Sequence, residues 1–135
     1  MYLSIQGNIG LGKAIDYFTS YQITVSIPLN DTQKYDLVAD INGELKRISV
    51  KTSRYLKKNK YGVKLNRAGG TSRKTIPFDN SSCDYIFVLT GDNRIYLIPS
   101  KIITSKYTVI INEKYAQYEV FIKPFSTFIN EISNL

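Results

Sequence analysis

The sequence contains no histidine and no tryptophan, and it has one cysteine among 135 residues. Without histidine the chain cannot form a Ser-His triad, a histidine acid–base catalyst or a histidine-ligated metal site. The single cysteine, Cys83, excludes an internal disulfide and a structural zinc site, and it fits a reducing cytosol. We therefore expect any catalytic metal to be a hard cation held by oxygen atoms, such as magnesium.

Long apolar runs are also missing. No run reaches the ~18 residues that a membrane span requires, and no charged start precedes an apolar stretch as in a signal peptide. A hydrophobic content of 43% with 21% charged residues is typical of a globular domain. We expect a single cytoplasmic domain over residues 1–135, with no membrane contact.

Acidic residues are absent from residues 45–78, where eleven of the chain's 18 basic residues lie. The rest of the chain has seven basic and eleven acidic residues, so the net charge of +7 is concentrated in this segment. Such a concentration indicates binding to a nucleic-acid backbone. The alternative is a solvated basic loop without a partner; a membrane surface is less favoured, because the basic residues do not follow an amphipathic helix.

We predict that residues 53–80 are a largely irregular basic segment, with a flexible tip at 68–72 and one strand at 61–65. Tyr55 and Tyr61 lie among the charges, and they either stack on bases or belong partly to the core. The predicted DNA-binding residues are Arg47, Arg54, Lys57, Lys58, Lys60, Lys64, Arg67, Arg73 and Lys74.

A hairpin is predicted over residues 35–52, because Asn42-Gly43 is a strong signal for a two-residue turn. The resulting register places Asp36 opposite Ser49. Because side chains alternate along a strand, Lys51 then lies on the same face as Ser49, one diagonal step from Asp36.

This acid and base are either an ordinary cross-strand ion pair or part of a functional site. The opposite face of the hairpin is predicted to be apolar and to form the core side; its residues are Tyr35, Leu37, Ala39, Ile48 and Val50. We therefore expect Asp36 and Lys51 to lie on the side away from this core.

The remaining pattern predicts an α/β domain. Helical spacing over residues 8–20 predicts a helix with Asn8 as its cap, and close packing against the hairpin would explain its glycines. Further strands are expected at 22–28, 84–90, 94–98, 108–112 and 118–122, with 84–90 buried on both faces. A short helix from residue 101 and a terminal helix at 125–135 complete a mixed β-sheet with a central hairpin flanked by helices.

The N-terminal helix, the following strand and the Asp-x14-Lys pair across a hairpin resemble the core of the PD-(D/E)XK nuclease superfamily. The phrases GLGKAIDYF, VSIPLNDTQKYDLVADINGELKRISVKTS and CDYIFVLTGDNRIYLIPSKI resemble its group I intron-associated endonucleases, to which Holliday junction resolvases are related. The resemblance implies a restriction-endonuclease-like fold and a bacterial or phage-encoded protein that cuts double-stranded DNA.

The resemblance also implies roles for individual residues. Asp36 would ligate Mg²⁺ or Mn²⁺ together with the backbone carbonyl of Val50, and Ser49-Val50-Lys51 would occupy the (D/E)XK position. Lys51 would orient the attacking water or stabilise charge on the phosphorus centre. The chain departs from the pattern at Ser49, where a carboxylate or glutamine is usual, and at Leu11, where some relatives have a glutamate.

Three interpretations remain open. The chain is an active magnesium-dependent DNA endonuclease, or a nuclease-derived protein that has lost catalysis and binds DNA or a protein partner as a regulator or inhibitor. The third interpretation is an unrelated basic α/β nucleic-acid-binding domain. Because cutting both strands of a duplex requires two active sites, the first implies a homodimer or homotetramer. The segment 115–135 either forms that contact or packs on its own sheet.

Overall fold

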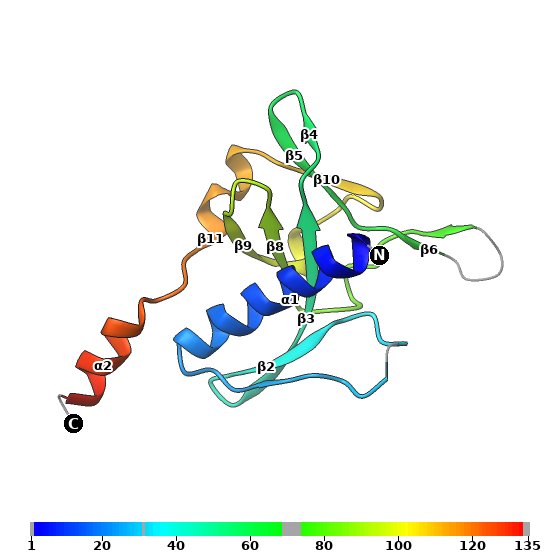
Figure 1. Ribbon diagram of the computed structural model, residues 1–135. Coiled ribbons are helices and arrows are strands. Elements are labelled where there is room, and N and C mark those ends of the chain that lie inside the picture. The colour runs from blue at the N-terminus through cyan, green and yellow to red at the C-terminus, as the bar shows by residue number, and fades with distance from the viewer. Residues whose placement is uncertain (1, 31, 69–73, 134–135) are drawn as a thin grey trace.

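The computed structural model describes residues 2–30, 32–68 and 74–133 of the chain. A mixed sheet lies at the centre, helix α1 (Tyr2–Ser20) crosses one of its faces, and smaller β-elements lie on the other (Figure 1). The strands of the main sheet, in spatial order, are β1 (Val25–Ser26), β2 (Leu37–Ile41), β3 (Glu44–Ser53), β8 (Tyr85–Thr90), β9 (Ile95–Pro99) and β11 (Glu119–Val120). The predicted α/β fold with a central hairpin and flanking helices is confirmed.

The β2–β3 hairpin has the predicted register, with Ile41 opposite Glu44 and Val38 opposite Arg47. Asn42 and Gly43 form the turn with φ values of 54° and 84°. Both values lie in the left-handed region, which Asn and Gly tolerate best and which a type I′ turn requires. The turn residues therefore fix which side chains share a face.

Strand β8 pairs with β3 in parallel and with β9 in antiparallel orientation, which makes the sheet mixed. Five of its six residues are buried, as expected for a continuous apolar run covered on both faces. Its position beside β3 fixes the strand that carries Ser49 and Lys51 at the middle of the sheet. The turn of 3-10 helix η2 (Ser100–Ile102) follows β9, close to the predicted short helix.

Helix α1 begins at Tyr2, so the prediction of an Asn8 cap is wrong and Asn8 lies inside the helix. The glycines misled the prediction, because they lower helix propensity without preventing a helix. Gly10 is buried against β3, where a Cβ atom would clash with Cγ2 of Thr52. Gly12 has no atom near the corresponding position, so close packing explains Gly10 alone.

Two apolar cores lie on opposite faces of the sheet. Ala14 and Phe18 of α1 pack on a cluster that includes Leu37, Ile48 and Phe87. The second cluster lies on the other face and contains Val63, Leu65, Cys83, Ile86, Val88, Tyr96, Ile98, Ile103, Val109 and Tyr115. The face that carries Ser49 and Lys51 is therefore partly covered by the second cluster. The prediction that only the opposite face of the hairpin forms a core was incomplete.

Tyr35 packs against this second cluster, so its predicted place on the α1 face is wrong. Strand β2 begins only at Leu37, and the alternation of side chains does not extend to the residues before the strand. Leu37, Ala39 and Ile48 do lie in the α1-side core, as predicted.

The basic segment is more regular than predicted. It contains the hairpin β4 (Leu56–Lys57) and β5 (Lys60–Lys64) and the short pair β6 (Arg67–Ala68) and β7 (Thr75–Ile76). The hairpin turns at Lys58 and Asn59, with φ values of 52° and 65°, and projects from the body of the protein (Figure 1). The strand predicted at 61–65 is confirmed as β5. Of the predicted tip at 68–72, Ala68 belongs to β6 and residues 69–72 lie outside the described residues.

The C-terminal part consists of β10 (Thr108–Ile111), the 3-10 helix η3 (Glu113–Tyr118), β11 and helix α2 (Phe125–Ser133). β10 joins β5 and β4 in a separate three-stranded sheet. The predicted strand at 22–28 is reduced to Val25–Ser26, because only these two residues pair with β2. No helix within the described ranges is long and apolar enough to cross a membrane.

Candidate active site

Asp36 lies immediately before β2, at the point where that strand leaves β3. Its backbone N–H donates to the carbonyl of Ile48 at 2.8 Å, and its carboxylate Oδ2 accepts from the N–H of Val50 at 2.6 Å. The Val50 N–H therefore bonds to the Asp36 carboxylate in place of a backbone carbonyl of β2. This bond gives Asp36 a role in the sheet that is independent of any catalytic role.

The backbone carbonyl of Val50 points in the same direction as its N–H, because both groups of one strand residue lie on the same side of the strand. The carbonyl is therefore directed past the end of β2, on the side where Asp36 lies. A carboxylate oxygen and a carbonyl oxygen are ligands that Mg²⁺ accepts.

Ser49 and Lys51 line a small hollow of about 50 Å³ on the face of the sheet away from α1. Ser49 is 5% exposed, whereas Asp36 is exposed and Lys51 is partly buried. Lys34, Asp79 and Ser82 also line the hollow. The structure thus brings Ser49 and Lys51 together, and Asp36 reaches the same stretch of β3 through Val50.

Comparison with known proteins identifies the family. The family model for the PD-(D/E)XK endonuclease matches residues 4–127. The chain belongs to the PD-(D/E)XK endonuclease family. Its structure is similar to that of the bacterial homing endonuclease I-Ssp6803I, with a TM-score of 0.70 and 21% sequence identity over 97% of this chain and 95% of that one. No match was found among the curated proteins.

Because the chain belongs to the PD-(D/E)XK family, we asked which oxygen atoms near Asp36 could bind a metal ion. In the described part of the chain, no three histidine, cysteine or acidic side chains cluster as a metal site. Mg²⁺ commonly uses one or two carboxylates and completes its shell with water and substrate phosphates. Asp36 and the Val50 carbonyl are two oxygen donors of the kind that such a sparse site uses.

Leu11, at the helix position where some PD-(D/E)XK relatives have an acid, packs against the α1-side core. This apolar environment suits a leucine and would penalise an unpaired carboxylate. The side chain at this position therefore contributes to stability and supplies no metal ligand.

The predicted DNA-binding residues are distributed over several elements. Lys57, Lys58 and Lys60 are exposed on the β4–β5 hairpin, which we call the basic arm (residues 54–64). Lys64 and Lys74 are also exposed, and Arg67 lies in β6. Arg73 lies outside the described residues. Six basic residues of the segment are therefore placed where a DNA backbone can approach the described surface: Arg54, Lys57, Lys58, Lys60, Lys64 and Lys74.

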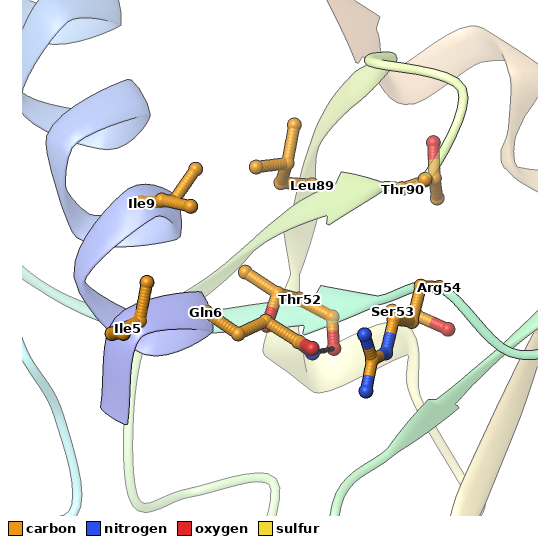
Figure 2. A pocket seen from close by; sticks show the side chains of 9 residues that line it. Ile5, Gln6, Ile9, Thr52, Ser53, Arg54, Leu89 and Thr90 are labelled. Atoms are coloured by element: carbon orange, nitrogen blue, oxygen red, sulfur yellow. Dashed lines mark hydrogen bonds between the residues drawn. The ribbon is translucent and has the colours of Figure 1, made fainter. Parts of the chain in front are cut away.

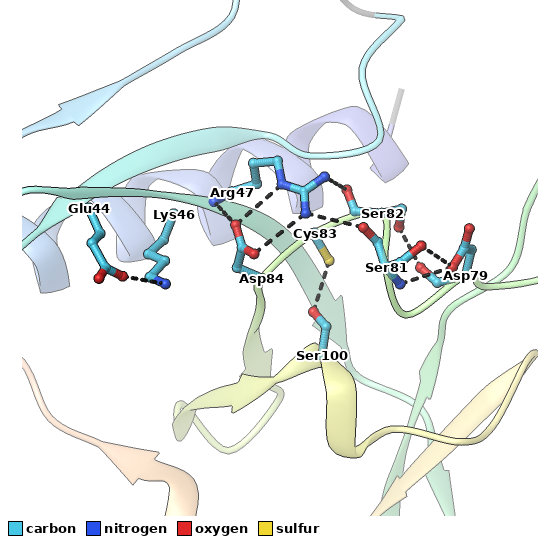
Figure 3. Close-up of polar contacts among 9 residues, drawn as sticks. All are labelled: Glu44, Lys46, Arg47, Asp79, Ser81, Ser82, Cys83, Asp84 and Ser100. Atoms are coloured by element: carbon cyan, nitrogen blue, oxygen red, sulfur yellow. Dashed lines mark hydrogen bonds and ion pairs between the residues drawn. The ribbon is translucent and has the colours of Figure 1, made fainter.

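Arg47 differs from these residues, because its guanidinium is held by the protein (Figure 3). Its Nε donates to Oδ2 of Asp84 at 3.3 Å, and its other nitrogens donate to the carbonyls of Ser81 and Ser82. Partial burial alone would raise the pKa of Asp84, but the backbone N–H and the guanidinium of Arg47 outweigh burial and lower that pKa. We therefore favour a structural role for Arg47, joining β3 to the loop before β8.

A larger hollow of about 290 Å³ lies on the α1 side of the sheet (Figure 2). It is mainly apolar, with Ile5 and Ile9 half exposed and a hydrogen bond of 2.8 Å from Gln6 Nε2 to Thr52 Oγ1. Among the described residues that line it, Arg54 at its edge is the one charged residue. Because it contains no carboxylate, this hollow is a poorer candidate for metal-dependent chemistry than the smaller one.

Sequence analysis missed Lys34 and Asp79. Asp79 accepts two bonds from Ser81, and an Asp-x-Ser turn is a recognisable local signal. That signal predicts a turn and contains no information on which strand the turn approaches.

Proposed function

We propose that this PD-(D/E)XK family member is a metal-dependent DNA endonuclease of the homing-endonuclease type. The observation that carries the proposal is the position of Asp36 against Val50 on the same strand that presents Lys51. The sheet contact accounts for Asp36 by itself, but a protein that only binds DNA has no need to combine this acid with an ammonium at the adjacent hollow. The family assignment supplies the class of reaction, which is hydrolysis of a phosphodiester bond.

Asp36 and the Val50 carbonyl would hold Mg²⁺, or Mn²⁺ in its place. When bound, such an ion neutralises the scissile phosphate and makes a bound water more acidic. The Lys51 ammonium would orient the attacking water or stabilise the charge that develops on the phosphate. Ser49 contributes a neutral hydroxyl, which can donate a hydrogen bond but does not add to the negative charge that attracts the ion.

Double-stranded DNA is the proposed substrate, and the basic arm is its main electrostatic contact. The arm carries three exposed lysines around the Lys58-Asn59 turn. Its base is anchored to the site strand, because Ser53 Oγ of β3 donates to the carbonyl of Gly62. Within the arm, the Gly62 N–H donates to the carbonyl of Tyr55 at 3.0 Å. A DNA backbone bound along the arm would therefore be held in a defined position relative to β3.

We also propose a homodimer or homotetramer, formed at least partly through α2. No residue of this nine-residue helix is buried among the described residues, and Phe125, Ile129 and Ile132 are 74%, 45% and 49% exposed. Isolated helices shorter than ~12 residues are marginal in water, so contact with another surface would stabilise α2. A second copy would also provide the second active site that cutting both strands requires.

The experiment that tests the enzyme is cleavage of supercoiled plasmid and long DNA by the wild type, Asp36→Asn and Asp40→Ala. Asparagine retains an oxygen that can accept from the Val50 N–H but removes the negative charge, so the sheet contact survives. Asp40 is an exposed aspartate of β2, four residues further along the chain, and serves as the control. We expect Asp36→Asn to abolish metal-dependent cutting and Asp40→Ala to cut normally; equal cutting by all three proteins would refute the proposed role of Asp36.

A second candidate function is a catalytically inactive nuclease-fold protein that binds DNA or a protein partner as a regulator or inhibitor. Ser49 and Leu11 favour it, because both occupy positions where relatives can have a metal-binding or polar group. It predicts salt-sensitive DNA binding, or binding to a protein, with no cutting under any metal condition. Under this function Asp36→Asn changes nothing except the local charge.

A further inference from the structure

The hollow beside Ser49 contains more charge than the family motif accounts for. Lys34, Lys51 and Asp79 line it together with the hydroxyl groups of Ser49 and Ser82. Two ammonium groups and one carboxylate give the hollow a net charge of about +1 at neutral pH. A volume of about 50 Å³ has room for ordered water or a phosphate oxygen but is too small for a nucleobase.

Asp79 is fixed in place by its own loop. Its Oδ1 accepts from the N–H and the Oγ of Ser81 at 2.9 and 2.7 Å, and its carbonyl accepts from the N–H of Ser82 at 3.0 Å. The loop is also tied to the segment before β10, because the Asn80 side chain donates to the carbonyl of Ile103 at 3.1 Å. The carboxylate is therefore a positioned negative charge and not a mobile surface group.

The electrostatics of Asp79 argue against a role as a general base. The two bonds from Ser81 lower its pKa, and the nearby Lys34 lowers it further. A carboxylate with a lowered pKa is a weaker proton acceptor than an ordinary one. What it offers is a constant attraction for a neighbouring ammonium group.

We propose that Lys34 is a second cationic contact for the DNA backbone at the active site, and that Asp79 is the positioning residue that holds it there beside Lys51. The proposal rests on the proposed function, since it assigns the hollow to a phosphate of bound DNA. Lys34 lies two residues before Asp36 and outside the basic segment 45–78. The charge of +1 in the hollow complements the single negative charge of one phosphodiester.

The pair is tested with a double-mutant cycle on the intact protein. The variants are Lys34→Ala, Asp79→Asn and their combination, with Lys34→Arg as the conservative replacement and the exposed Lys101→Ala as the matched control. Affinity for a duplex oligonucleotide is measured in EDTA over a range of salt concentrations, and cleavage rates are measured as a function of Mg²⁺ concentration. Lys34 and Asp79 are both exposed, so the variants are expected to fold, which thermal unfolding checks.

We expect Lys34→Ala to weaken binding about fivefold and to lower the salt slope by about 0.9, the value for one lost phosphate contact. Asp79→Asn should weaken binding by a smaller factor while Lys34 is present, and it should no longer weaken binding once Lys34 is alanine. Lys34→Arg should restore most of the affinity, and Lys101→Ala should match the wild type. An effect of Lys34→Ala no larger than that of Lys101→Ala, or an additive cycle, would overturn the pairing.

One other outcome would replace the proposal with a different role for Asp79. If Asp79→Asn leaves binding in EDTA unchanged but raises the Mg²⁺ concentration needed for cleavage, Asp79 is a metal ligand and does not position Lys34. The binding arm also separates this inference from the proposed function. A wild type that binds DNA without cutting it contradicts the enzyme, and the cycle in EDTA still decides whether Lys34 and Asp79 act as a pair on bound DNA.

Discussion

The two faces of strand β3 make a direct comparison within one element. Val50 and Thr52 face α1 beside a large apolar hollow, whereas Ser49 and Lys51 face the other way into a small charged one. The larger hollow has the greater capacity for an apolar group, but none of the described residues that line it has a carboxylate. The smaller one has the charges that recognise a phosphate, so the kind of side chain indicates the site better than the size of the hollow.

Substituting neighbouring residues on opposite faces should break this comparison most clearly. We expect Lys51→Ala to lower the cleavage rate on the order of 10³-fold, because it removes the ammonium that acts on the reacting phosphate. Thr52→Val, one residue further on, should leave the rate close to that of the wild type. Single-turnover cleavage of plasmid DNA measures both, and a comparable loss in the two variants would show that the faces do not differ in function.

The basic arm provides a second, smaller effect that concerns binding. Changing Lys57, Lys58 and Lys60 together to glutamate should weaken duplex binding at least about 10²-fold and flatten its dependence on salt. The same reversal of Lys13, Lys101 and Lys114 adds the same charge elsewhere and serves as the control. Similar losses in the two triple variants would mean that net charge, and not the arm, controls affinity.

Two glycines of α1 test how closely the helix packs on the apolar face of β3. Gly10→Ala places a methyl group against Thr52 and should destabilise the fold by about 1–3 kcal/mol, since overpacking outweighs the gain in helix propensity. Gly12→Ala meets no neighbouring atom and should stabilise by up to about 1 kcal/mol. Urea unfolding measures both changes; a stabilising Gly10→Ala would contradict the close contact between α1 and β3.

The pH dependence of stability tests the Arg47–Asp84 contact and has the smallest expected effect. The pKa of Asp84 in the folded protein lies below its ordinary value of 3.8, so its stabilisation is complete above that value and is lost as the pH falls through the folded pKa. Between about pH 6 and about pH 3, Asp84→Asn should therefore lose less stability than the wild type. Asp40→Asn, at an exposed aspartate of β2, is the control, and an identical acid dependence in Asp84→Asn and the wild type would contradict the contact.

Much of the sheet was predictable because its signals are local. Asn42-Gly43 fixed the turn and the register, and the apolar run at 84–90 identified the central strand β8. The start of α1 was not predictable from propensity, because Gly10 is tolerated only through its contact with Thr52, which is distant in sequence. The β4–β5 turn was not predicted because lysine rarely adopts the positive φ that Lys58 has here. The Lys58-Asn59 pair therefore gives no turn signal of the Asn-Gly kind.

In the candidate site too, local features were predictable and contacts between distant segments were not. The shared face of Ser49 and Lys51 follows from the alternation of side chains along β3. The approach of Asp79 and Lys34 to that strand depends on how two loops pack, and neither loop has a pattern that specifies its neighbour. The bond from the Val50 N–H to Asp36 likewise depends on the residue at which β2 begins.

The most direct test of the central claim is the metal dependence of DNA cutting by the wild-type protein. Supercoiled plasmid is incubated with Mg²⁺, Mn²⁺ or EDTA, and duplex binding is measured under the same conditions. The account predicts cutting with either metal and none in EDTA, while binding persists in all three. Intact plasmid with both metals, alongside salt-sensitive binding, would contradict it and identify the chain as a nuclease fold without nuclease activity.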